Sequence, residues 1–167
     1  ALWWPMQLAA LHFGWPKPPA GSLPAALLHA PALLLETYPA SIFGFLLTVF
    51  PRWMSQPDLI ARQFGPVSGG LAIGMTASAI GLWTGADTPV RIGFLICAAS
   101  WALGLVVLAA VVRANRRSDK PPCWHAVSAL AALTIGLGAL LLVCAFLIAG
   151  DPRLLRWGNV LGLNGFI

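Results

Sequence analysis

Three ionisable side chains stand inside or at the edge of long apolar stretches near the start of this sequence. His12 lies two residues before the first apolar stretch ends, His29 lies in the first turns of the next one, and Glu36 follows seven residues later. An ionisable group in hydrocarbon is costly unless it has a partner or a task. These three residues are therefore the first candidates for function.

The two histidines suggest a metal or haem site. A turn joins the stretches that carry His12 and His29, so both residues are expected near the same face of a membrane. Neutral imidazoles from two adjacent helices can supply axial nitrogens to a haem iron buried between them. The alternative is a histidine hydrogen-bonded to a backbone carbonyl that Pro31 or Pro39 leaves without its usual donor. The spacing leaves both interpretations open.

Glu36 allows two interpretations of its own. On a helix it would lie on nearly the same face as His29 but about 10 Å further along the axis, which is too far for direct pairing. It could be a carboxyl that relays protons, or a protonated acid that is hydrogen-bonded inside a helix bundle. Of the two, we favour the buried acid.

The composition predicts the solvent in which these residues work. The chain is 59% hydrophobic and 9% charged, with a mean hydropathy of +0.82, whereas about a quarter of the residues in a soluble domain are charged. The formal charge of +5 does not indicate nucleic-acid binding, because the basic residues form short clusters between apolar runs. The sequence therefore predicts an integral membrane protein with the lipid bilayer as its main partner. The cysteines show no CxxC spacing and suggest packing residues: Cys97, Cys123 and Cys144.

The apolar pattern predicts an all-α, polytopic bundle of five to six transmembrane helices, forming a single domain over residues 1–167. A 14-residue first helix rises only about 21 Å, short of the roughly 30 Å hydrocarbon core. It is therefore expected to be truncated, in a piece of a longer chain. Pro31 and Pro39 are expected to break the long second helix. The expected helices cover about 1–14, 23–50, 66–85, 90–112 and 124–149, with an incomplete segment from about 157.

Small side chains recur at four-residue spacing on the third expected helix, at Gly70, Gly74 and Ser78. Such a stripe lets a second helix approach closely, since little else drives helices together in lipid. We interpret these three residues as a packing face.

Basic residues predict the orientation of the chain, because loops on alternate sides of the membrane differ in their number of Lys and Arg residues. The loops after the second and fourth expected helices contain Arg52, Arg62, Arg113, Arg116, Arg117 and Lys120. The other loops contain Lys17, Arg91, Arg153 and Arg156. The loop 113–120 is therefore predicted to be cytoplasmic. His125 would begin the fifth helix on that side, across the membrane from the other two histidines, and is interpreted as an interfacial residue.

One block of the sequence resembles a known family. The run HAPALLLETYPASIFGFLLTVFPRW, residues 29–53, is similar to the first motif block of the NnrS family, which reads approximately WHAHEM, then a helix, then GFLLTAVPNW. The segment Gly44 to Thr48, with Pro51 and Trp53, matches the end of that block, and His29 falls at its first histidine. The basic loop 113–120, followed by two prolines, also resembles the family. At the second histidine position this chain has Pro31 instead.

The resemblance implies a polytopic protein of the bacterial inner membrane that contains haem and copper and is linked to nitric oxide metabolism. It selects His29 as a haem ligand, and His12 remains the second candidate ligand from the spacing. A copper site that used the second histidine would lack a ligand here. The alternative is a non-catalytic subunit that packs onto a larger respiratory or photosynthetic membrane complex through its helices. No catalytic constellation is evident, which argues against an enzyme. A transporter is a third interpretation, based on the broken helix alone.

The predicted orientation can be tested by labelling single cysteines from outside intact cells. With the loop 113–120 in the cytoplasm, we expect labelling of Ala20→Cys and none of Ser118→Cys. Strong labelling of Ser118→Cys with none of Ala20→Cys would reverse the orientation.

Overall fold

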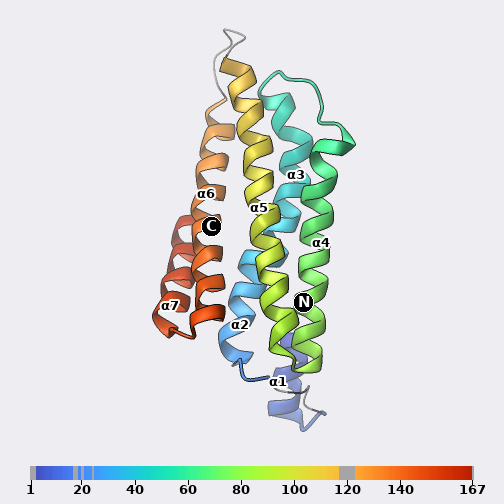
Figure 1. Cartoon of the computed structure of the whole chain (residues 1–167), viewed down its shortest axis with the longest axis vertical. Helices are drawn as coiled ribbons and strands as arrows, with labels where there is room; N and C mark the ends of the chain where they lie inside the picture. The colour runs from blue at the N-terminus through green and yellow to red at the C-terminus, as the bar shows by residue number, and fades with distance from the viewer. Residues whose placement is uncertain (1–2, 17–18, 20, 24, 117–122, 167) are drawn as a thin grey trace.

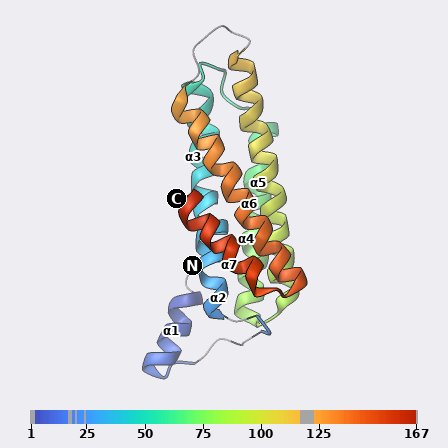
Figure 2. The same ribbon diagram turned by 90° about the vertical axis from the view of Figure 1, so that its left-hand side faces the viewer.

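The computed structural model describes residues 3–16, 19, 21–23, 25–116 and 123–166, and these residues form helices without any strand. The fold is the all-α membrane bundle that the sequence predicts. Figures 1 and 2 show long helices lying side by side along one axis. The helices are α1 (Trp3–Phe13), α2 (Ala25–Pro31), the π-helix η1 (Ala32–Thr37), α3 (Tyr38–Trp53), α4 (Ala61–Thr84), α5 (Asp87–Arg116), α6 (Trp124–Ala149), α7 (Pro152–Leu161) and the π-helix η2 (Gly162–Phe166).

Four helical stretches in the described residues are long and apolar enough to cross a membrane: Leu27–Trp53, Ala61–Thr84, Asp87–Asn115 and Trp124–Ala149. The first expected helix is not one of them. Its observed form, α1, has 11 residues and therefore rises only about 16 Å. It lies at one end of the bundle, close to the start of α2 (Figure 2).

Between Pro31 and Pro39 the regular α-helix is interrupted, as the prolines predict, but the chain does not leave the helical path. The chain stays helical from Ala25 to Trp53 and passes through the π-helix η1 between the two prolines. At the end of η1 the Tyr38 N–H donates to the Leu33 carbonyl, five residues earlier. The Thr37 hydroxyl donates to the Ala32 carbonyl over 3.1 Å. The wider turn and this hydroxyl accommodate a segment in which Pro39 cannot donate, so the chain continues as a helix.

The expected last segment also begins earlier than residue 157. Helix α6 ends at Ala149 and is followed by Gly150, whose φ of +73° is the left-handed conformation common after helix ends. Asp151 then caps α7, because its side chain accepts from the Arg153 N–H over 2.9 Å, and Pro152 occupies the first helical position. This short connection turns α7 back alongside α6 (Figure 1).

Helices α4 and α5 make the closest pairing in the bundle. A side chain at Gly74 would meet the Gly93 carbonyl oxygen at 2.8 Å, and one at Gly81 would meet the Val90 backbone nitrogen at 2.7 Å. Gly70 faces the Ser100 hydroxyl in the same way. The small residues of α4 therefore face α5, where larger side chains would push the two backbones apart.

The helix ends next to the two most basic connections lie together in the bundle. The end of α3, the end of α5 and the start of α6 lie at one end of the bundle, opposite α1 and α2 (Figure 1). His125, in the first turn of α6, is exposed there. Residues 117–122 of the predicted cytoplasmic loop lie outside the described residues, and its cytoplasmic side stays a prediction.

Gly74→Leu should destabilise the bundle, because the new side chain would force α4 and α5 apart. We expect a loss of at least the roughly 1–3 kcal/mol that overpacked cores show, measured as a lower midpoint of thermal unfolding in detergent. Gly69→Leu is the matched control, since a side chain there meets nothing within 4 Å. If both variants unfold at the same temperature, the α4–α5 contact does not limit stability.

Candidate functional site

Glu36 is the most deeply buried acidic side chain among the described residues, with 4% of its surface exposed. The π-helix η1 positions it toward α4, where the Ser78 hydroxyl donates a hydrogen bond of 2.6 Å to its carboxyl. Cys97 of α5 lies beside the same carboxyl. No Lys, Arg or His side chain in the described part of the chain forms an ion pair with Glu36. The carboxyl is thus held by neutral donors from two other helices.

This arrangement gives Ser78 a second role beside packing. Glu36 follows the start of its span at Leu27 by nine residues, and Ser78 precedes the end of α4 at Thr84 by six. Glu36 therefore lies about 14 Å and Ser78 about 9 Å from the same end of the bundle. Comparing depths in two antiparallel helices could have identified this pair from the sequence. Whether Glu36 relays protons is not tested and stays a prediction.

His29 lies near the end of α2 and stacks on Trp4 of α1. The two rings are nearly parallel, at 10°, with their centroids 4.2 Å apart. The histidine is half-buried. Stacking covers a face of the imidazole, whereas the ring nitrogens that bind metals lie at its edge. Trp4 thus fixes the plane of the His29 ring.

His12 is not brought to the same place. It is exposed on α1 and follows Trp4 by eight residues, which is about 12 Å along the helix. Among the described residues no group of three or more His, Cys, Asp and Glu side chains could hold a metal ion. The structure thus places His29, and not His12, against Trp4, and haem binding by either histidine stays a prediction.

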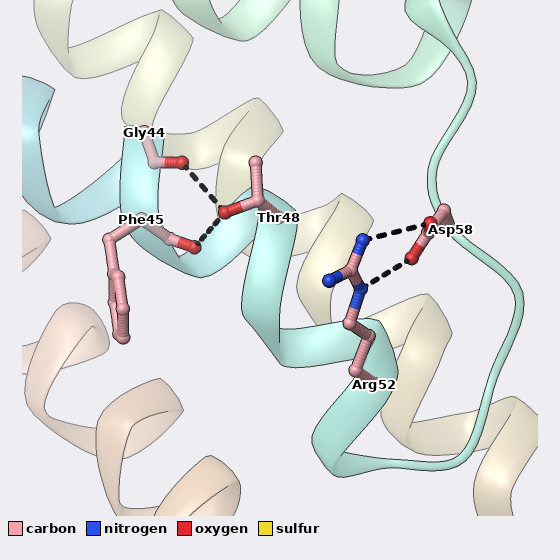
Figure 3. A network of polar contacts seen from close by, with 5 residues as sticks. All are labelled: Gly44, Phe45, Thr48, Arg52 and Asp58. Carbon is pink, nitrogen blue, oxygen red and sulfur yellow. Dashed lines mark hydrogen bonds and ion pairs between the residues drawn. The ribbon is translucent and has the colours of Figure 1, made fainter.

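A second polar group lies at the opposite end of α3 (Figure 3). The Arg52 Nε and Nη2 atoms donate to the two Asp58 carboxylate oxygens over 3.1 and 3.2 Å. These hydrogen bonds, together with the charge of Arg52, hold the pKa of the Asp58 carboxyl below its usual range. One turn earlier, the Thr48 hydroxyl donates to the Phe45 carbonyl over 2.7 Å. From the sequence, Arg52 was interpreted only as a topology signal, and its pairing with Asp58 was not predicted.

Comparison with known proteins gives one result for the whole chain. The family model described as NnrS protein matches residues 1–167. Neither the curated proteins nor the solved structures give a match.

Ser78→Ala should lower the stability of the protein, because the buried Glu36 carboxyl loses its hydroxyl donor. We expect a cost of about 1 to 2 kcal/mol, seen as a lower unfolding midpoint in detergent. Thr76→Ala is the control, since this exposed hydroxyl donates only to the Ala72 carbonyl of its own helix. Equal midpoints for the two variants would show that the Ser78 bond adds no stability.

Proposed function

The chain belongs to the NnrS protein family, and on that basis we propose that it binds haem in the membrane with His29 as an axial ligand. The nitric oxide link follows from the resemblance of residues 29–53 to the first motif block of that family. A haem iron with an open position would supply a binding site for small diatomic gases. The residues of this chain would contribute the axial nitrogen and the orientation of the ring that carries it.

The stack of Trp4 on His29 is the observation that carries this proposal. An axial ligand needs a fixed ring plane, because the nitrogen lone pair must point at the iron. The 4.2 Å stack fixes that plane from a neighbouring helix. His29 is also the histidine that matches the family block, so the physical and the family arguments select the same residue. His12 is exposed, and we do not propose it as a second haem ligand.

A second candidate function is a non-catalytic subunit that packs onto a larger membrane complex. Pro31, at the position of the family's second histidine, favours it. This residue is buried at the start of the π-helix η1, where it serves the backbone geometry and cannot bind a metal. In this interpretation His29 serves only packing and hydrogen bonding.

Absorption spectra of the purified protein from haem-replete cells distinguish these functions. We expect a Soret band in the wild-type protein and its loss or shift in His29→Ala, because losing an axial nitrogen changes the spin state and the affinity of the iron. His12→Ala and His125→Ala are matched controls that should keep the spectrum, since both side chains are exposed and lie away from His29.

A colourless wild-type protein would reject haem binding and leave the packing subunit. A spectrum that changes in His12→Ala and not in His29→Ala would place the ligand elsewhere.

A further inference from the structure

Two neighbouring cavities lie between α3 and α4, on a part of the structure that the proposed haem site does not use. The first, about 370 Å³, is lined by Gly44, Thr48 and Ser68 and reaches the Arg52–Asp58 pair. The second, about 350 Å³, shares Ser68 with the first and extends to Ala40 and Met75. Because the two cavities lie side by side at Ser68, we consider them together as the α3–α4 groove.

Gly44 and Ser68 are small, so they leave space between α3 and α4 in the groove. A side chain added at Gly44 would meet nothing within 4 Å. The remaining lining is largely apolar, with Leu47 and Phe64 in the first cavity and Phe43 and Leu71 in the second. A groove with such walls would hold a hydrocarbon chain.

The length and depth of the groove match one leaflet of a bilayer. Arg52 is next to Trp53, a residue type enriched where membrane and water meet. From Arg52 to Ala40 the helix rises about 18 Å, and half of a hydrocarbon core is about 15 Å. An acyl chain with its headgroup at Arg52 would therefore lie along the groove and end near the middle of the bilayer.

The charge at this end of the bundle favours a negative headgroup. Arg52, Arg62 and Arg113 are exposed here. Asp58, between α3 and α4, is the acidic residue of the described structure at this end. The side chains of the Arg52–Asp58 pair are 71% and 64% exposed, so a headgroup can reach them. A phosphate beside Arg52 would meet a net positive surface, which attracts anionic lipids.

From these observations we propose that the α3–α4 groove binds one anionic phospholipid, with an acyl chain between α3 and α4 and its phosphate at Arg52. In this arrangement Asp58 weakens the attraction by neutralising part of the Arg52 charge. The site thus combines a chain groove with a charged entrance, and it makes opposite predictions for the two members of one ion pair.

The charge prediction is tested by titrating the delipidated, detergent-solubilised protein with phosphatidylglycerol and with phosphatidylcholine of the same acyl chains, followed by native mass spectrometry. We expect one phosphatidylglycerol bound more tightly than phosphatidylcholine. Asp58→Asn should raise the phosphatidylglycerol affinity about fivefold and Arg52→Gln should lower it about fivefold, as expected for one charge near a membrane surface. Neither change should alter phosphatidylcholine binding.

The groove prediction uses a matched pair of glycines. Gly44→Leu should fill the groove and abolish the preference for phosphatidylglycerol, whereas Gly69→Leu should retain it. Both glycines have open space around them, but only Gly44 lines the groove. Size-exclusion chromatography shows whether each variant is folded. If Gly44→Leu does not fold, the Arg52 and Asp58 variants still test the site.

Three outcomes would overturn the proposal. The first is equal affinity of the wild-type protein for the two lipids. The second is a shift of phosphatidylglycerol affinity in the same direction in Arg52→Gln and Asp58→Asn, which would indicate a structural effect of breaking the pair. The third is tighter binding of a neutral amphiphile, such as an isoprenoid quinone, than of phosphatidylglycerol. In that case Gly44→Leu would abolish binding of the neutral amphiphile, and the Arg52 and Asp58 variants would not change it.

Discussion

The close approach of α4 and α5 is the constraint on which the rest of the structure depends. Helices in lipid gain little from burying apolar surface against one another, so association relies on close van der Waals contact and on buried polar bonds. Gly74 and Gly93 allow both at once, because each lies against the backbone of the opposite helix. The same two helices bring Ser78 of α4 and Cys97 of α5 to the Glu36 carboxyl, and together they form its polar surroundings. The packing face and the buried carboxyl are thus parts of one arrangement.

Sequence patterns predicted the helices well where hydropathy and end signals agree. The expected helix 124–149 and the observed α6 have the same bounds. The helix expected from residue 66 begins at Ala61 instead, because the Ile60 N–H is satisfied by the Gln63 side chain over 2.9 Å, and Pro66 is accommodated inside the helix. Helix α5 likewise begins at Asp87, an acidic residue suited to a first turn. From the sequence, Gln63 and Asp87 were assigned to loops, so both helices were predicted to begin too late.

The candidate site was harder to predict, because it depends on which side chains face each other. The sequence predicts that His12 and His29 lie near the same face of the membrane. The residue of α1 that contacts His29 is nevertheless Trp4. Two residues on one short helix point in directions that periodicity describes only relative to each other. Periodicity within α1 therefore does not predict which of them faces α2. The Arg52–Asp58 pair was missed for the same reason, since a six-residue separation across a helix end has no fixed geometry.

The three ionisable groups singled out by the structure all belong to one continuous stretch, the helical span Leu27–Trp53 and the loop that follows it. His29 lies near one end, Glu36 in the π-helix η1, and Arg52 near the other end. Their separations of seven and sixteen residues correspond to about 10 and 24 Å of helix, so they occupy three depths and cannot form one site.

This stretch also contains the only π-helical segment within the four long spans of the described structure. A regular helix would turn the residues after Pro39 by roughly 100° relative to their observed direction, since η1 accommodates one additional residue. Glu36 could then not face Ser78 while Phe43 packs edge-on against Trp101 of α5, with ring centroids 5.9 Å apart. The π-turn is thus the local irregularity that lets one helix present a buried carboxyl to α4 and an aromatic side chain to α5.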